Sequence, residues 1–149
     1  MKISYTALKL DHPDPVTKLL KDLVPMLSVR LGISHQQTPR FLAVVDSGSG
    51  VCMFKTDIAD YLKIDFIKKN VGIGEVGGII QGPKQAIYYC PVRLYVADNW
   101  IINITAGFLK KLPVAGILGR TGFFDHFSVS FDHRVSPPQF EIDRATKPN

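Results

Sequence analysis

The chain has 149 residues, 46% hydrophobic and 21% charged, which is the composition of an ordinary folded domain and excludes a disordered chain. A chain of this length is most simply one domain, and it can bury about two-thirds of its unfolded surface. No run of about 18 apolar residues is present, so no membrane partner is expected. The formal net charge is +5, but the basic residues stand singly or in pairs without an accompanying aromatic cluster. Nucleic acid is therefore not an expected partner.

The cysteine content and the N-terminus point to a reducing compartment. Cys52 and Cys90 are too few for a disulfide framework and both have apolar neighbours, so we expect two buried thiols. The N-terminus has no long apolar stretch typical of a secretory signal, and a cytoplasmic location is the expectation. The histidines and cysteines show no His-x-x-x-His or Cys-x-x-Cys spacing, so neither a metal site nor a cofactor is expected.

The first 23 residues are predicted to form a strand followed by a helix. Residues 3–10 alternate apolar and polar side chains, as a short strand does. Asp14-Pro15 is typical of a helix start, because a capping residue precedes proline at the first helical position. An apolar stripe at the spacing of one helical face follows, at Val16, Leu19, Leu20 and Leu23. We therefore expect a helix that packs on the core and ends at Pro25.

Residues 41–45 are predicted to be a strand buried on both faces, because they form a continuous apolar run rich in branched side chains. Residues 26–31 form a similar run, and a polar connection joins the two. Together they predict an antiparallel hairpin that delivers Asp46 at its end. A further apolar run lies at 51–54, and Thr56-Asp57 is typical of the start of a short helix through residue 62.

Residues 71–82 are rich in glycine and contain a formal G-x-G-x-x-G pattern. A dinucleotide-binding interpretation is rejected, because that pattern should open a helix within a strand–helix–strand unit. Here it is followed by Gly78, Gly82 and Pro83, which resist a helix. A glycine-rich hairpin with an apolar tip is the favoured interpretation.

The rest of the chain is predicted to be mainly β. Strands are expected at 86–96 and 100–108 around an Asp98-Asn99 turn, and a short apolar run lies at 115–118. Thr121-Gly122 is consistent with a single helical turn through Phe127, and residues 128–132 and 139–142 predict a closing hairpin. The expected fold is a closed β-barrel or sandwich with a glycine-rich hairpin and two or three short helices. Residues 1–149 would form one domain, with an extension at 1–23 and a core at 24–143.

Asp46 is the first candidate functional residue. A carboxylate at the end of a buried strand is costly unless it is capped or used, because burial opposes its charged form. One interpretation is an Asx turn, in which Asp46 accepts hydrogen bonds from nearby backbone amides. The other is catalysis. Other nucleophiles are disfavoured, because the cysteines have the surroundings of structural thiols and Ser47 and Ser49 lack the G-x-S-x-G elbow.

Three motifs follow one another along the chain, and together they favour the catalytic interpretation. They are Asp46-Ser47-Gly48, Ile73-Gly74-Glu75-Val76-Gly77-Gly78 and Ile117-Leu118-Gly119-Arg120. In this order they resemble the retropepsin-like aspartic proteases, the retroviral-type family that also occurs in bacterial chains. The segment 119–127 also looks like bacterial members, and the resemblance covers roughly residues 24–131.

This resemblance implies an aspartic endopeptidase with a retropepsin-like barrel and a flap hairpin, acting on a peptide or protein substrate. Two carboxylates that lie close together share one proton, so one can accept a proton from water while the other donates one. The sequence holds a single Asp-Ser-Gly triplet, so Asp46 would meet its twin in a homodimer.

The resemblance also implies roles for residues around Asp46. Ser47, Gly48 and Ser49 would complete the active-site loop, with the Ser47 hydroxyl locking the two loops together. The flap would close over the substrate through Ile73, Gly74, Val76, Gly77 and Gly78. Val114 and Ile117 match wall positions of the substrate cleft. Leu118, Gly119 and Arg120 would support the loop from behind.

The sequence departs from the family pattern at Gly50. Many members carry an acid there that pairs with the arginine of the Gly-Arg element, so Arg120 lacks its usual partner. Asp125 and Asp132 are the candidate substitutes. The missing acid favours an alternative function, a catalytically inactive dimeric domain that binds peptides with the same fold, whereas the intact Asp46-Ser47-Gly48 favours catalysis.

Overall fold

The computed structural model describes residues 1–67, 72–76 and 84–145, and it is mainly β, with 54% of residues in strands and 5% in a helix. The elements in chain order are β1 (Lys2–Ser4), β2 (Thr6–Lys9), β3 (Lys21–Val24), β4 (Met26–Ile33), β5 (Gln36–Gln37), β6 (Phe41–Val45), β7 (Met53–Lys55), α1 (Thr56–Tyr61), β8 (Gly72–Val76), β9 (Gln85–Val96), β10 (Trp100–Leu109), β11 (Gly116–Leu118), β12 (Phe127–Asp132) and β13 (Gln139–Arg144). No helix in this described part is long and apolar enough to cross a membrane.

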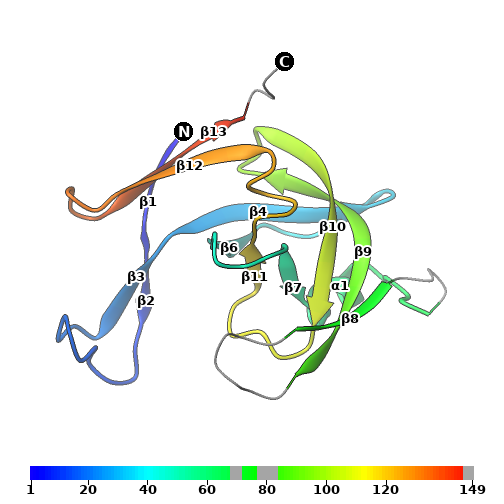
Figure 1. Cartoon of the computed structure of the whole chain (residues 1–149), viewed down its shortest axis with the longest axis horizontal. Helices are drawn as coiled ribbons and strands as arrows, with labels where there is room; N and C mark the ends of the chain where they lie inside the picture. The colour runs from blue at the N-terminus through cyan, green and yellow to red at the C-terminus, as the bar shows by residue number, and fades with distance from the viewer. Residues whose placement is uncertain (68–71, 77–83, 146–149) are drawn as a thin grey trace.

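Six strands close into a barrel, which confirms the expected barrel (Figure 1). The sheet order is β5-β4-β6-β11-β7-β10-β9-β8, and β4 pairs again with β9 to close the ring. The β9–β10 hairpin follows the prediction closely, with Val96 opposite Trp100 across a tight turn. Ala97 and Asp98 in this turn have φ of 47° and 60°. Tight β-hairpin turns need this left-handed backbone to match the twist of the two strands. Parallel pairing occurs between β6 and β11 and between β7 and β10.

Alternating side chains of the barrel strands fill one core. Its largest fully buried members are aromatic, and Phe54 contacts both Phe41 and Phe108 with ring centroids 5.9 and 6.1 Å apart. Cys52 and Cys90 are both buried thiols, as the sequence predicts. Burying a large aromatic side chain typically contributes 1.5–3 kcal/mol. This core therefore fixes the strands that carry the candidate site.

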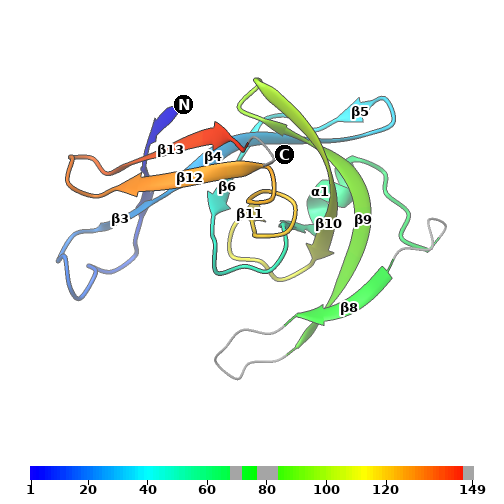
Figure 2. The same cartoon turned by 45° about the horizontal axis from the view of Figure 1, so that its top comes forward.

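A second sheet of order β1-β13-β12 covers one end of the barrel (Figures 1 and 2). The predicted closing hairpin is confirmed as β12 and β13, and β1 adds to it with Ile3 opposite Phe140. Phe140 and Phe127 join the barrel core, where the Phe127 ring stacks on Phe123 at 5.0 Å. Residues near the two ends of the chain are thus tied to the barrel through one sheet.

The predicted N-terminal helix is wrong, because residues 6–24 form a β-hairpin in which β2 and β3 pair with each other. Asp14 does cap a turn, since its Oδ1 accepts from the amides of Val16 and Thr17 at 2.9 and 2.6 Å. Lys18 then adopts φ 61°, which ends the helical path, and the chain returns with the Leu10 amide donating to the Leu20 carbonyl. The apolar stripe that predicted a helix therefore does not pack on the core.

Two smaller predictions are corrected. The strand expected at 3–10 is divided at Tyr5 into β1 and β2, which belong to different sheets. The helical turn expected after Thr121-Gly122 is absent. Residues 122–126 form successive hydrogen-bonded turns, and Phe127 already belongs to β12. The short helix after β7 is confirmed as α1, although its capping residue is Lys55 and it has no side-chain cap.

Candidate active site

Asp46 is held at the end of β6 by strands on both sides. The Val45 amide donates to the Pro25 carbonyl at 2.8 Å, and the Asp46 amide donates to the Leu118 carbonyl at 3.1 Å. The first bond joins β6 to the end of β4, and the second joins it to β11, which runs parallel with Leu118 opposite Val45. The carboxylate of Asp46 is half-buried at this point. The strand delivers an acidic side chain to the end of β6, as the sequence predicts, but the prediction that it is buried on both faces is wrong. Ala43 and Val45 are buried on one face, whereas Leu42 on the other is 41% exposed.

The Asx turn that the sequence offered as one interpretation is present. Asp46 Oδ1 accepts from the Gly48 amide at 2.8 Å, and the Asp46 carbonyl accepts from the Ser49 amide at 3.2 Å. The other carboxylate oxygen makes no hydrogen bond to a described residue. The turn therefore orients the carboxylate and leaves one oxygen for another group, so the Asx turn and a catalytic role are compatible.

The segment after β11 packs directly against residues 46–51, which we call the Asp46 loop. A Cβ at Gly119 would lie 2.2 Å from the Val51 carbonyl oxygen and 2.9 Å from that of Ser49, so only glycine allows this approach. The Arg120 amide donates to Ser49 O at 2.9 Å and the Thr121 amide donates to a loop carbonyl at 3.0 Å. Leu118 is fully buried just before this contact. The loop is therefore fixed by backbone contacts as well as by its own turn.

The Arg120 side chain bonds to the loop instead of to a carboxylate. Its Nη1 donates to the carbonyls of Ser47 and Gly48 at 2.9 and 3.2 Å. A Cβ at Gly50 would lie 3.8 Å from Arg120 Nη2, so the position of the missing acid does face the guanidinium. The Nη1 atom of Arg120 is therefore bonded to backbone carbonyls of the loop.

Neither candidate substitute for that acid pairs with the guanidinium in the described structure. Asp125 Oδ2 accepts from the Gly122 amide at 3.0 Å. Asp132 forms an ion pair with Arg134, 2.9 Å from Oδ1 to Nε, and hydrogen bonding from this side chain lowers the pKa of Asp132 to about 2. Both aspartates therefore bond to other groups in the described part of the chain.

The two serines of the Asp46 loop differ in exposure. Ser49 is 9% exposed and its hydroxyl donates to the Val51 carbonyl at 2.8 Å, so it stabilises the loop from within. Ser47 is exposed, and its hydroxyl makes no hydrogen bond to a described residue. Of the two, Ser47 is the one that a second molecule can reach.

A second, smaller apolar cluster extends from the end of the Asp46 loop. Its buried members are Ile87, Leu109 and Leu112, and the half-buried side chains Val51, Met53, Tyr89, Val114 and Ile117 pack on them. The predicted cleft residues Val114 and Ile117 therefore lie on a partly exposed apolar surface beside the loop. Ile87 and Tyr89 were missed by sequence reasoning, although the alternation along β9 marks both as neighbours on one face.

The glycine-rich motif is described in part. β8 pairs antiparallel with β9, and a Cβ at Gly74 would lie 3.1 Å from the Tyr89 ring and 3.4 Å from Ile87 Cγ2. The predicted flap strand thus lies against the second apolar cluster, and Ile73 is 71% exposed. Val76 ends β8, whereas Gly77 and Gly78 lie outside the described residues.

Cys52 lies beneath the loop, with its Sγ 3.9 Å from the Gly119 carbonyl. Burial raises the pKa of this thiol to about 11, so it stays protonated at neutral pH. A thiolate nucleophile requires a lowered pKa, and this environment does the opposite. Cys52 therefore has the properties of a packing residue.

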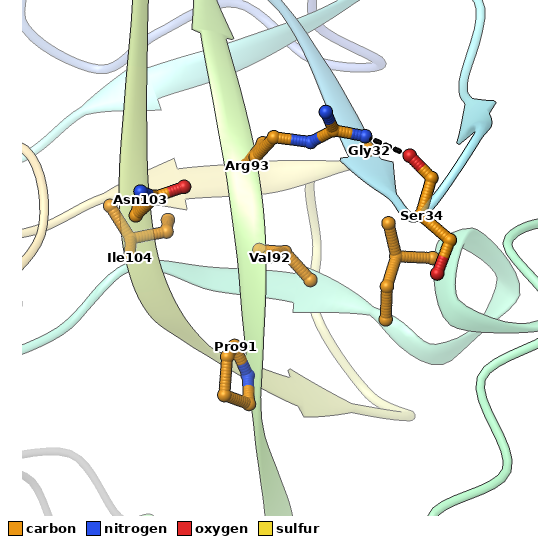
Figure 3. A pocket seen from close by; sticks show the side chains of 8 residues that line it. Gly32, Ser34, Pro91, Val92, Arg93, Asn103 and Ile104 are labelled. Atoms are coloured by element: carbon orange, nitrogen blue, oxygen red, sulfur yellow. Dashed lines mark hydrogen bonds between the residues drawn. The ribbon is translucent and has the colours of Figure 1, made fainter.

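Four cavities lined by described residues do not include Asp46. One of about 210 Å³ lies on the barrel wall between β4, β9 and β10, and Arg93 closes its upper side by donating to the Ser34 carbonyl (Figure 3). Its lining is mostly apolar, and the acidic residues needed for acid–base chemistry are not among its lining side chains. Among described residues there is also no group of three or more His, Cys, Asp or Glu side chains that could hold a metal ion.

No family model matches the chain, and no curated protein matches it either. The function therefore has to be inferred from the motifs and from the geometry around Asp46.

Proposed function

We propose that the chain is an aspartic endopeptidase of the retropepsin-like type that acts as a homodimer. The observation that supports this most strongly is the Asp46 carboxylate itself. It stands at the rim of the barrel, one oxygen is held by the Gly48 amide, and the backbone around it is fixed by Gly119. Preorganised polar groups of this kind are what catalysis at a fixed geometry requires.

The chemistry needs a second carboxylate. Two carboxylates a few Å apart cannot both ionise, so the pair holds one proton and titrates jointly. The ionised partner accepts a proton from the attacking water, and the protonated partner donates one to the peptide group. Since the chain has one Asp-Ser-Gly triplet, the second carboxylate is Asp46 of another copy, related by a two-fold axis. The exposed Ser47 hydroxyl is then available to bind the partner's loop.

The surroundings of Asp46 support a peptide as the substrate. The second apolar cluster offers half-buried side chains at Val114 and Ile117 next to the loop, and β8 lies against the same cluster. An extended peptide between the loop and β8 would find apolar side-chain contacts there and backbone partners along the strand. Closure of the flap over such a peptide would exclude water from the reaction.

A second candidate function is a dimeric peptide-binding domain without turnover. The observation that favours it is the contact between Arg120 and the carbonyls of Ser47 and Gly48, in a loop that lacks the acid at Gly50. The same geometry could serve binding alone if the two carboxylates are not held close enough to share a proton.

Cleavage of a mixed peptide library decides between the two functions. It is measured from about pH 4 to about pH 7 at several protein concentrations, with and without a pepstatin-type inhibitor. We expect inhibitable cleavage whose specific activity rises with concentration. Asp46→Asn should abolish it while fold and dimer persist, whereas the control Asp60→Asn, on the exposed face of α1, should not. Cleavage by Asp46→Asn at the parent's rate would overturn the proposal, and peptide binding without cleavage would establish the binding domain.

A further inference from the structure

The hairpin of residues 6–24, which we call the arm, has no strand neighbour in the described structure. β2 and β3 pair only with each other, through four residue pairs from Thr6 opposite Val24 to Lys9 opposite Lys21. A two-stranded ribbon by itself is marginally stable in water, and it needs another surface to pack against. In both views the arm extends away from the barrel (Figures 1 and 2).

The arm begins where the Asp46 loop begins. The last bond between β4 and β6 runs from the Val45 amide to the Pro25 carbonyl at 2.8 Å. Next to this pair, Val24, which precedes Pro25, is the last residue of the arm, and Asp46, which follows Val45, is the first residue of the loop. Figures 1 and 2 both show the arm on the side of the barrel where β6 ends. Any molecule that meets Asp46 from this side therefore also meets the base of the arm.

The far part of the arm exposes apolar side chains. Val16 is 85% exposed, Leu20 is 55% exposed and Leu19 is 47% exposed. Scattered exposed apolar residues are ordinary, but three within five residues of a ribbon that pairs with no other strand of the described structure mark an interaction surface. The arm also carries three lysines and three aspartates, so its charges balance and give no preference for a strongly acidic or basic partner.

We propose that the arm packs against a second copy of this chain and holds the two Asp46 loops together. This inference rests on the proposed function, because a site with one aspartate per chain is incomplete without the second copy. A stable interface buries roughly 800 Å² on each partner, and the six residues of the Asp46 loop cannot supply that area. Under two-fold symmetry each copy contributes one arm, so the contact is made twice.

Sedimentation equilibrium of the full chain tests the arm. In the double variant Leu19→Ser/Leu20→Ser we expect the dimer dissociation constant to rise at least about tenfold, because two apolar contacts per arm are lost. The matched control is Val135→Ser, an apolar residue 41% exposed outside the arm. Both variants change exposed side chains, and circular dichroism checks that the fold is kept. The same experiment is repeated with Asp46→Asn added to each protein, so that the dissociation constants are also compared in the absence of turnover.

Cross-linking identifies what the arm contacts. A photoreactive side chain is placed at Val16 in an equal mixture of ¹⁴N- and ¹⁵N-labelled protein, and cross-linked peptides are analysed by mass. Mixed-isotope peptides that join the arm of one copy to another copy are the expected result. Cross-links confined to single chains would overturn the proposal.

The outcomes separate this inference from the proposed function. A dissociation constant equal in the double variant and in Val135→Ser overturns the role of the arm, even if cleavage is observed. Arm-dependent dimers that never cleave peptides support the arm and overturn the protease. A protein that is monomeric at every concentration overturns both.

Discussion

The Asp46 loop and the arm leave the barrel at the same place, yet they are stabilised in opposite ways. The loop is held by its own Asx turn, by amides of residues 120 and 121, and by the close approach of Gly119. Within the described structure, the arm is held by its internal ribbon and by a turn capped by Asp14, and Val16, Leu19 and Leu20 face solvent. In the proposed homodimer the Asp46 carboxylate lies at a fixed distance from that of the second copy, which requires the first kind of support. A surface that is buried only on association can do without such support in the single chain, as the arm does.

The largest effect should come from removing the support behind the loop. Gly119→Ala places a Cβ 2.2 Å from the Val51 carbonyl oxygen, so the backbone of one or both segments must move. We expect the free energy of unfolding to fall by more than about 3 kcal/mol, measured by urea denaturation. Gly50→Ala is the matched control, since its nearest neighbour is 3.8 Å away, and it should change stability by less than about 1 kcal/mol. Equal losses in the two variants would contradict the role of Gly119.

The buried thiol under the loop gives the next largest effect. Burial raises the pKa of the Cys52 thiol from 9.0 to about 11 in the folded protein. The stability that the buried, protonated thiol contributes is therefore fully present below pH 9 and is lost as the pH rises to about 11. Over this window the free energy of unfolding should fall by about 1.4 kcal/mol per pH unit. Other groups also titrate there, so the test is the difference from Cys52→Ala. Parallel pH profiles for the two proteins would show that the thiol is not buried in solution.

Restoring the missing acid should strengthen the loop modestly. In Gly50→Asp the new carboxylate would face the Arg120 guanidinium, and an exposed pair of this kind contributes about 0.2–1 kcal/mol. Thermal unfolding at low and high salt measures it, because a screened ion pair weakens as salt increases. Gly50→Asn is the control without charge. A gain that is identical in both variants, or insensitive to salt, would argue against ion pairing with Arg120.

The smallest effect should appear in the arm. Hydrogen bonds from the amides of Thr17 and Val16 lower the pKa of the Asp14 carboxyl below its usual value of 3.8. The turn is therefore supported above pH 3.8, and that support is lost as the pH falls through the lowered pKa. We expect the amide resonances of both residues to titrate with Asp14 while those of the barrel stay unchanged. Asp14→Asn should remove this titration, and its persistence would assign it to another group.

The barrel and the arm also differ in how far they follow from the sequence. The strand at 41–45 is predicted with its observed bounds, because a short apolar run rich in branched side chains between polar segments favours a strand over a helix. The arm is predicted as a helix, because Asp14-Pro15 and the apolar spacing satisfy every local helix signal. What decides otherwise is the left-handed backbone at Lys18 and the pairing of β2 with β3, and neither is visible in helical periodicity.

The candidate site is predictable only in part for a related reason. That Gly119 and Arg120 would lie behind Asp46 came from resemblance to a family, since no spacing rule brings residues 46 and 119 together. The contact between Arg120 and the carbonyls of Ser47 and Gly48 depends on the shape of the folded loop. Ile87 and Tyr89 lie beside the site because β9 packs them into the second apolar cluster, and β8 approaches both of them. Motifs identify the residues that carry chemistry, whereas the fold decides their partners.

The parallel pairing of β6 with β11 has a consequence for the order of events during synthesis. Val44 lies opposite Ile117, and the bonds that fix the Asp46 loop come from residues 118–121. A growing chain on the ribosome therefore carries Asp46 long before it carries the segment that shapes the loop. The loop cannot take its final form until residues 118–121 have been made. Until then, the nascent chain cannot present a folded Asp46 loop to neighbouring molecules.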